Sequence, residues 1–314
     1  MLEISAGEGG HFLTVGEALL SVPYGTSAVI SIAPGVYREK LFVDKSDILL
    51  RGAGSDKTTI VWDDGGFQPH PDGHKKGTFR SYTLFLGGGR VAVENLTVAN
   101  TAGDGRVAGQ AIAAYVDAER AFFQNVRLLG RQDTLFCAPL PEAEREKRGF
   151  CGPRHLTPRK PSTQYYKNCY IEGDVDFIFG GADALFEDCE ICSLDRGEDI
   201  NGYVTAPSGS ADGLGFVFYR CRFTSDCPPG TVYLGRPWRP YGKTALLNCA
   251  IDAHIHPEGW SRWKDGPDEA QFREYACDGP GSGTQNRAPW ARRLSENDAR
   301  ELLSRAKAAA KKAA

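Results

Sequence analysis

VENLTV at residues 93–98 and FQNVRL at residues 123–128 are two copies of one short pattern, in which apolar positions alternate around a polar residue. The pattern returns around residues 168, 188, 220 and 248, so that successive copies stand 30, 43, 20, 32 and 28 residues apart. Alternation with a period of two predicts strands, and one strand type at irregular steps is typical of a stacked repeat. Since no helical pattern separates the copies, we expect an all-β fold, a parallel β-helix, and not a doubly wound sheet.

Stacked coils would place equivalent residues of the repeat one above another. One inner column is then expected from Leu96, Val126, Cys169, Cys189, Cys221 and Cys249. The chain has nine cysteines, and those in the column stand singly without a CxxC pair, which favours free buried thiols over disulfides or metal ligands. A stacked turn or ladder position is expected at Asn95, Asn125, Asn168 and Asn248.

The two ends of the chain differ from the repeats. Residues 9–20 predict a strand-to-helix cap that covers the N-terminal coil, as solenoids require. The sequence SEND at residues 295–298 has the capping-box pattern and predicts a C-terminal helix over about residues 295–310, with an Ala/Lys tail that frays. Because composition does not change between the halves, we expect a single domain over residues 1–314.

Charge and composition exclude several functional classes. A net charge of -3 gives no general attraction for nucleic acid, and the absence of a run of about 18 apolar residues predicts no membrane span. Residues 1–5 lack the basic start of a secretory leader, so a cytoplasmic protein is expected. His70 with His74, and His254 with His256, lack a nearby third ligand, so no metal site is expected.

The segment DFIFG at residues 176–180 places an acid inside an apolar strand, where a carboxylate is costly unless it is paired or protonated. Stacking can bring Asp133, from QDTL at residues 132–135, beside Asp176. Two close carboxylates acquire different pKa values, which suits one ionised nucleophile or base and one protonated acid. Arg236, from LGRPW at residues 234–238, is placed to hold the ionised partner.

Two glutamines complete this predicted site. Gln110 and Gln132 are neutral amide donors that suit an oxyanion without discharging a nearby carboxylate. A carboxylate pair alone would equally suit glycoside hydrolysis, and the glutamines favour acyl chemistry on an ester or amide carbonyl.

Five motifs in this order resemble those of the pectin methylesterases, a family of carbohydrate esterases (family 8). The motifs lie at residues 35–39 (GVYRE), 109–113 (GQAIA), 132–135, 176–180 and 234–238, and the resemblance runs from about residue 10 to residue 283. It implies a right-handed parallel β-helix that hydrolyses galacturonate C6 methyl esters and releases methanol, without a metal or other cofactor. By this resemblance Asp176 is the nucleophile, Asp133 the general acid and base, and Arg236 the group that orients Asp176, while the oxyanion rests on Gln110 and Gln132.

The resemblance also assigns the sugar groove. It implies substrate-binding roles for Thr101, Gln110, Phe136, Phe179, Arg236, Trp238 and Trp260. The expected substrate is methyl-esterified homogalacturonan or its oligogalacturonides, and we expect a monomer of the bacterial type that has no signal peptide. Glu39 and Tyr37 are expected to serve the structure of an early coil.

The chain departs from the family pattern between QDTL and DFIFG. An inserted loop is expected at about residues 137–161, with six Lys or Arg against three Glu. We interpret it as a wall at one end of the groove that binds free carboxylates. Two other functions stay open at this point, a polygalacturonase or pectate lyase on the same fold and a catalytically silent carbohydrate-binding β-helix. The acid and histidine cluster of the former is not visible, and the complete set of acids, glutamines and arginine disfavours the latter.

Overall fold

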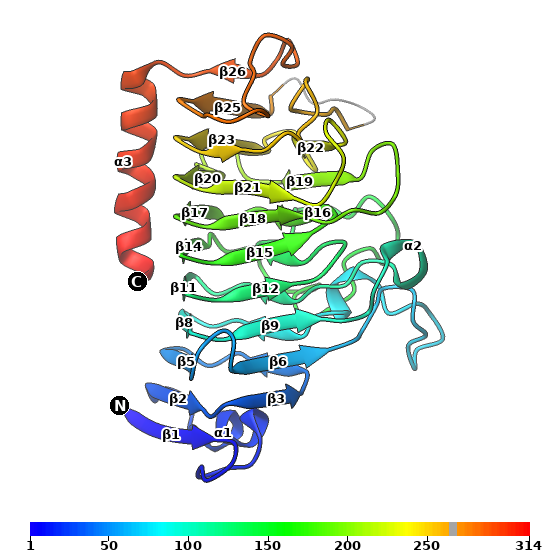
Figure 1. Ribbon diagram of the computed structural model, residues 1–314. Coiled ribbons are helices and arrows are strands. Elements are labelled where there is room, and N and C mark those ends of the chain that lie inside the picture. The colour runs from blue at the N-terminus through cyan, green and yellow to red at the C-terminus, as the bar shows by residue number, and fades with distance from the viewer. Residues whose placement is uncertain (264–268) are drawn as a thin grey trace.

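The computed structural model describes residues 1–263 and 269–314, and the chain winds into a stack of coils built on three sheets (Figure 1). Neighbouring strands within each sheet are parallel, and each complete coil adds one strand to each sheet. The predicted parallel β-helix is therefore confirmed.

The three sheets have eleven, eight and seven strands. The eleven-stranded sheet contains β1 (Leu2–Ala6), β2 (Ala28–Ile32), β5 (Ile48–Gly52), β8 (Arg90–Glu94), β11 (Arg120–Gln124), β14 (Thr163–Lys167), β17 (Asp183–Glu187), β20 (Phe216–Tyr219), β23 (Lys243–Leu247), β25 (Gln271–Tyr275) and β26 (Arg292–Arg293). The eight-stranded sheet contains β3 (Gly35–Arg38), β6 (Thr58–Trp62), β9 (Thr97–Asn100), β12 (Arg127–Leu129), β15 (Tyr170–Gly173), β18 (Glu190–Ser193), β21 (Arg222–Ser225) and β24 (Ala250–Ile251). The seven-stranded sheet contains β4 (Leu41–Val43), β7 (Leu84–Leu86), β10 (Ala114–Val116), β13 (Leu135–Cys137), β16 (Val175–Gly180), β19 (Gly202–Pro207) and β22 (Val232–Gly235).

The predicted inner column is present at the turn from the eleven-stranded to the eight-stranded sheet. Its six side chains are at most 2% exposed: Leu96, Val126, Cys169, Cys189, Cys221 and Cys249. The residue before each of them has a left-handed backbone, with φ between 52° and 56°, at positions 95, 125, 168, 188, 220 and 248. We call these six positions the ladder corner. Asn125 Nδ2 donates to Asn95 Oδ1 (3.0 Å), as a ladder requires, and the nine cysteines are free thiols.

Helix α1 (Val15–Ser21) covers the N-terminal coil, as predicted (Figure 1). Thr14 and Glu17 form a capping box at its start. The Glu39 carboxylate accepts from the backbone N–H groups of Val15 (2.9 Å) and Gly16 (2.7 Å), so it satisfies two donors that the first helical turn leaves free. The GVYRE motif therefore serves the cap, which confirms the structural role expected for Glu39.

Helix α3 (Glu296–Ala313) lies along the outer face of the eleven-stranded sheet (Figure 1). Ser295 caps its start by accepting from the N–H of Asp298 (3.2 Å). The expected fraying of its tail is wrong, because Ala310 and Ala313 are 3% and 1% exposed and Lys307 forms an ion pair with Glu187 (3.1 Å). Small alanine side chains let the helix approach the sheet, and that packing keeps the last turns helical.

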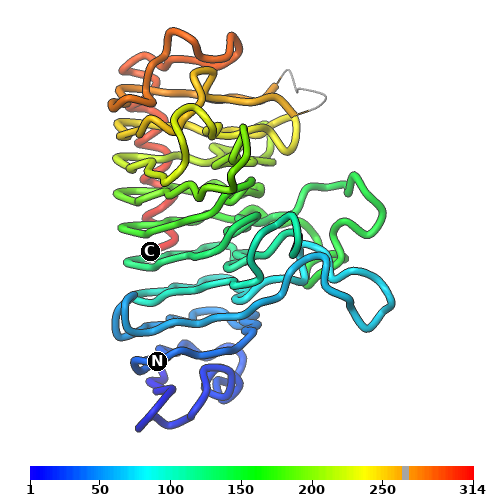
Figure 2. Tube along the Cα trace, turned by 45° about the vertical axis from the view of Figure 1, so that its right-hand side comes forward, coloured from blue at the N-terminus to red at the C-terminus, as the bar shows by residue number. Residues whose placement is uncertain are grey.

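Two long excursions leave the stack on the same side, residues 63–83 between β6 and β7 and residues 138–162 between β13 and β14 (Figure 2). The first contains the short helix η1 (Thr78–Arg80), and a third loop carries α2 (Gly105–Ala108). The Arg148–Asp72 ion pair (2.7 Å) joins the two excursions. No helix among the described residues is long and apolar enough to cross a membrane.

Candidate active site

Asp133 and Asp176 occupy equivalent positions of neighbouring coils, at the turn from the eight-stranded to the seven-stranded sheet. Leu135 pairs with Ile178, and the same register carried back by two residues aligns the two acids. The N–H of Asp133 donates to the carbonyl of Val175 (3.0 Å). Both acids have left-handed backbones, with φ of 65° and 51°, and are 8% and 7% exposed. Buried acids in this sparsely populated conformation mark a functional site, which we call the acid corner.

Arg236 reaches Asp176 from the coil two steps further along the stack. Its Nε donates to Oδ1 (2.9 Å) and its Nη2 to Oδ2 (2.7 Å), a bidentate pair that fixes the carboxylate in one orientation. The guanidinium also lies over the rings of Tyr203 and Trp263, at 3.8 Å and 4.2 Å from their centroids. Charge and orientation of Asp176 are therefore set by a group that is itself held by aromatic rings.

The two acids differ in their electrostatic surroundings. Burial, and then the charge of Asp176, raises the pKa of Asp133 well above its usual range, although the Arg236 charge opposes this. Burial also raises the pKa of Asp176, but here the charge and the hydrogen bonds of Arg236 oppose burial directly. Because Asp133 has no ion pair within the described ranges and Asp176 has one, protonation is favoured at Asp133 over Asp176.

Gln110 and Gln132 line the same cavity as the acids, a hollow of about 390 Å³. Neither side-chain amide has a hydrogen-bond partner in the described part of the chain, so both can donate to a bound group. Gly105 of α2 packs directly on Gln132, where a Cβ atom would lie 2.3 Å from Oε1. A glycine at this position therefore lets α2 hold the Gln132 side chain in place.

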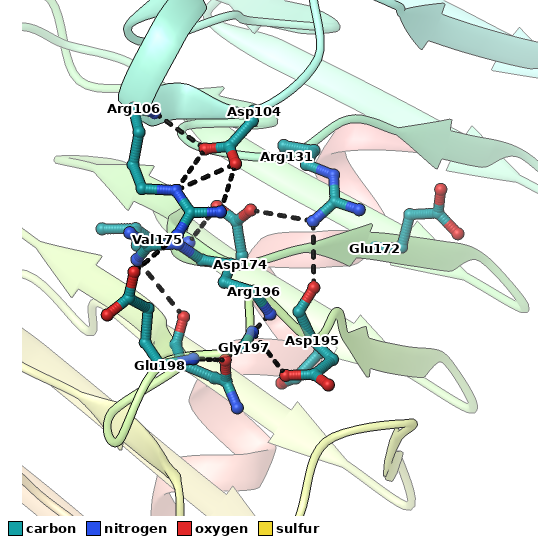
Figure 3. Close-up of polar contacts among 12 residues, drawn as sticks. Asp104, Arg106, Arg131, Glu172, Asp174, Val175, Asp195, Arg196, Gly197 and Glu198 are labelled. Atoms are coloured by element: carbon teal, nitrogen blue, oxygen red, sulfur yellow. Dashed lines mark hydrogen bonds and ion pairs between the residues drawn. The ribbon is translucent and has the colours of Figure 1, made fainter.

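Asp174, two residues before Asp176, is a structural part of the site that the sequence did not suggest (Figure 3). It is 1% exposed, and its Oδ1 accepts from the N–H of Val175 (2.7 Å). Its Oδ2 lies 3.5 Å from Arg131 Nη1, and its carbonyl accepts from the N–H of Tyr203 (3.0 Å). Asp174 thus ties three coils together at the turn that presents Asp176. Its only sequence signal is a second acid in the segment DVD.

The predicted sugar-binding residues divide into two groups. Phe179 and Trp238 line the cavity, as do Gln110 and Arg236. Phe136 is fully buried and packs between Tyr115 and Phe179, with ring centroids 4.7 Å and 4.8 Å away, so its assignment to the groove surface is wrong.

Trp260 and Thr101 also lie apart from the cavity. Trp260 is 1% exposed, packs against Phe272 and donates from Nε1 to Glu274 (2.9 Å). It is therefore a core residue, and its predicted assignment to the sugar groove is wrong. Trp263, three residues later, lines the cavity together with Trp238. Thr101 is exposed, but its hydroxyl and its N–H both donate to the Trp62 carbonyl and it does not line the cavity.

Several cavity residues were not among the predicted site residues. Except for Ala206, which lies in β19, they come from loops whose position no repeat predicts. They are Thr78, Phe79, Arg145, Glu146, Gly149, Phe150, Ala206, Arg239 and Trp263. Four of them belong to the inserted loop, which therefore walls the cavity as the sequence analysis expected.

The sequence and the structure of this chain are similar to those of known proteins. A family model described as Pectinesterase matches residues 2–141 and 159–307. Pectinesterase 31 of Arabidopsis thaliana is 36% identical over 311 residues, which are 95% of this chain and 89% of that protein. The structure is similar to that of pectin methylesterase PemA from Erwinia chrysanthemi, with a TM-score of 0.76 and 27% identity over 96% of this chain and 94% of the other. It is equally similar to a pectin methylesterase in complex with a hexasaccharide, with a TM-score of 0.77 and 27% identity over 96% and 95% of the two chains.

These matches bear on the fold and on the inserted loop. The stack of coils is the expected right-handed parallel β-helix, with a C-terminal helix. The family match is interrupted over residues 142–158, which lie inside the loop between β13 and β14. The cavity wall that carries Arg145 and Phe150 therefore lies in a segment outside the family match.

Proposed function

Since this chain belongs to the pectinesterase family and is a carboxylic ester hydrolase that demethylesterifies pectin, we propose that Asp176 is its nucleophile and Asp133 its general acid and base. The observation that carries this assignment is the asymmetry of the acid corner. Arg236 pairs with Asp176 through two hydrogen bonds, while Asp133 is buried beside them without an ion pair in the described residues. One acid is therefore suited to attack and the other to donate a proton.

In the first half of the reaction, a carboxylate oxygen of Asp176 attacks the C6 carbonyl carbon of a methylated galacturonate. The carbonyl oxygen becomes an oxyanion that accepts hydrogen bonds from the amides of Gln110 and Gln132. As the tetrahedral centre collapses, the bond from C6 to the methoxy oxygen breaks. Asp133 transfers its proton to that oxygen, and methanol leaves an anhydride between Asp176 and the sugar.

In the second half, Asp133 is an ionised base. It takes a proton from a water molecule, whose oxygen attacks the anhydride at the sugar carbonyl. The bond to the Asp176 oxygen breaks, which releases a free galacturonate and restores both acids to their starting protonation states. Arg236 stabilises the Asp176 carboxylate at the start and at the end of the cycle, so it makes this oxygen a better leaving group in the second half.

The substrate we propose is methyl-esterified homogalacturonan or its oligogalacturonides. The aromatic rings of Phe179 and Trp238 beside the acids support it, because sugar rings pack on aromatic faces. A cytoplasmic location, a bacterial source and a monomeric state remain predictions from the sequence.

Methanol release from methylated pectin, measured for the wild type and for Asp176→Asn, tests the nucleophile. We expect release by the wild type and only background release by the variant. Trapping is a second readout, since a quenched wild-type reaction with labelled methylated oligogalacturonide should leave label on the peptide that contains Asp176. Equal rates for the two proteins would overturn the assignment.

A further inference from the structure

Arg145 and Arg239 line the active-site cavity, and neither has a carboxylate partner among the residues that the structure describes. Arg239 Nη1 donates to the Trp238 carbonyl (2.9 Å) and its Nη2 to the Ala143 carbonyl (3.1 Å), so its hydrogen-bond partners are neutral. No carboxylate of residues 1–263 or 269–314 lies within 4.0 Å of either guanidinium, whereas Arg236 in the same cavity has Asp176. Uncompensated guanidiniums in a cavity create a site for an anion.

Each of the two guanidiniums lies over an aromatic ring. Arg239 lies over Trp238, 4.7 Å from the ring centroid, and Arg145 lies over Trp263 at 5.5 Å. Burial, and then the charge of Arg145, lowers the pKa of Arg239 to about 10, which agrees with two positive groups facing the same space. The Arg239 guanidinium also donates two hydrogen bonds, so it loses little further conformational entropy when it binds an anion.

Among the described lining residues, acidic groups compensate this pair of arginines only in part. Asp176 is paired with Arg236, and burial beside Asp176 raises the pKa of Asp133, which favours its neutral form. Glu146 is then the remaining acid among the described lining residues, against two arginines. The described lining residues thus carry an excess positive charge next to the acids that are proposed to cleave a neutral ester.

The inserted loop that supplies Arg145 is anchored to the stack on several sides. Arg154 pairs with Asp117 (2.6 Å), and Arg148 pairs with Asp72 of the neighbouring excursion (2.7 Å). The Phe150 ring packs against Trp238, with centroids 6.3 Å apart. The anchored loop therefore carries the exposed Arg145 side chain at the cavity.

We propose that Arg145 and Arg239 bind the free carboxylate of a uronate sugar that neighbours the methylated one. This proposal rests on the proposed function, because it takes the ester-bearing sugar to lie at Asp176. A planar guanidinium matches a carboxylate through paired N–H donors, whereas a methyl ester has no charge to offer. The enzyme is then selective for partly de-esterified galacturonan, and this selectivity depends on the inserted loop.

The test compares kcat/KM for two trigalacturonates, one methylated at a single sugar and one methylated at all three. For Arg145→Gln we expect a fall of about tenfold on the singly methylated trimer, the factor for one hydrogen bond between charged groups, and less than about twofold on the fully methylated trimer. Lys147→Gln is the matched control, because it removes one positive charge from an exposed position of the same loop that does not line the cavity. It should leave both values unchanged.

A binding measurement separates this proposal from the proposed function. Calorimetry with unesterified trigalacturonate and the Asp176→Asn protein should show binding that Arg145→Gln, added to that variant, weakens by about tenfold. Unchanged binding overturns the proposal, and so does an equal loss of kcat/KM on both trimers, which would mean that Arg145 acts through Trp263 on Arg236. If the wild type releases no methanol from either trimer, the proposed function fails, while the binding result still decides whether the carboxylate site exists.

Discussion

Asp176 with Arg236 at the acid corner and Asp188 with Arg220 at the ladder corner are nearly the same construction. Both aspartates have left-handed backbones, with φ of 51° and 56°. Each arginine donates from Nε to Oδ1 and from Nη2 to Oδ2, at 2.9 Å and 2.7 Å in the acid corner and at 2.8 Å and 2.6 Å in the ladder corner. Local geometry alone therefore does not distinguish a catalytic group from a structural one.

The surroundings of the two pairs differ. The side chains of Asp188 and Arg220 are 34% and 49% exposed, and water screens their charges. Those of Asp176 and Arg236 are 11% and 22% exposed, and a second acid, Asp133, is buried beside them. The ladder corner also recurs in six coils, whereas left-handed acids occupy the acid corner in two neighbouring coils. Burial and a like-charged neighbour convert a turn residue of this solenoid into a reactive one.

Replacing each of the two aspartates by asparagine should give the largest difference in activity between the two corners. Asp176→Asn should lower kcat by a factor on the order of 10³ or more, since the nucleophile is lost. Asp188→Asn, the matched control, should leave kcat within about twofold, because asparagine already occupies this backbone conformation at residue 168. Methanol release measures both, with circular dichroism as the check on folding. A comparable loss of activity in the two variants would mean that the ladder corner contributes to the chemistry.

The second acid should give the acid corner its pH dependence. Activity of the wild type should rise as Asp176 loses its proton and fall at higher pH as Asp133 loses its own, because the pKa of Asp133 is raised further by burial and by Asp176. Asp133→Asn should lower kcat by about 10²- to 10⁴-fold and remove the alkaline limb of the pH–rate profile. The profile of kcat/KM between pH 4 and about 10 checks this. An alkaline limb that persists in the variant would assign it to another group.

Replacing each arginine by lysine tests whether the bidentate hydrogen bonds contribute to activity beyond the positive charge. Arg236→Lys keeps a charge near Asp176 but loses the paired N–H donors, and we expect kcat to fall by about 10- to 100-fold. The acid limb of the pH–rate profile should move to higher pH, because burial then raises the pKa of Asp176 with less opposition. Arg220→Lys should change neither quantity. If the acid limb stays in place, Arg236 does not control the ionisation of Asp176.

Repetition explains why much of the fold could be predicted from the sequence. The polar residue before Leu96, Val126 and the column cysteines recurs in phase with the strands, so one alignment of the copies predicts strands, column and ladder together. The acids could be predicted as neighbours by the same stacking argument. Their different protonation, however, depends on burial and on the reach of Arg236 across two coils, which strand patterns do not contain.

The predictions from sequence that proved wrong concern residues whose burial depends on packing between elements. Trp260 and Trp263 are both tryptophans of one turn, and only the path of that turn buries the first and places the second at the cavity. Phe136 is aromatic, as sugar-binding residues often are, but the rings of Phe79, Tyr115 and Phe179 pack around it and bury it. Alanine and lysine favour a helix in the tail of α3, but the sequence does not show that this tail packs on the protein, and that packing buries Ala310 and Ala313.

The smallest effect is expected from the ladder corner itself. Asn125→Ala forces a left-handed backbone on a residue with a Cβ and removes the hydrogen bond to Asn95, which should lower the free energy of unfolding by about 1–2 kcal/mol. Asn125→Gly, the matched control, loses the same hydrogen bond but tolerates the backbone, so its loss should be smaller. Urea denaturation measures both, and kcat should stay within about twofold of the wild type. If the alanine variant loses activity before it loses stability, the ladder transmits strain to the acid corner, and the two corners are not independent.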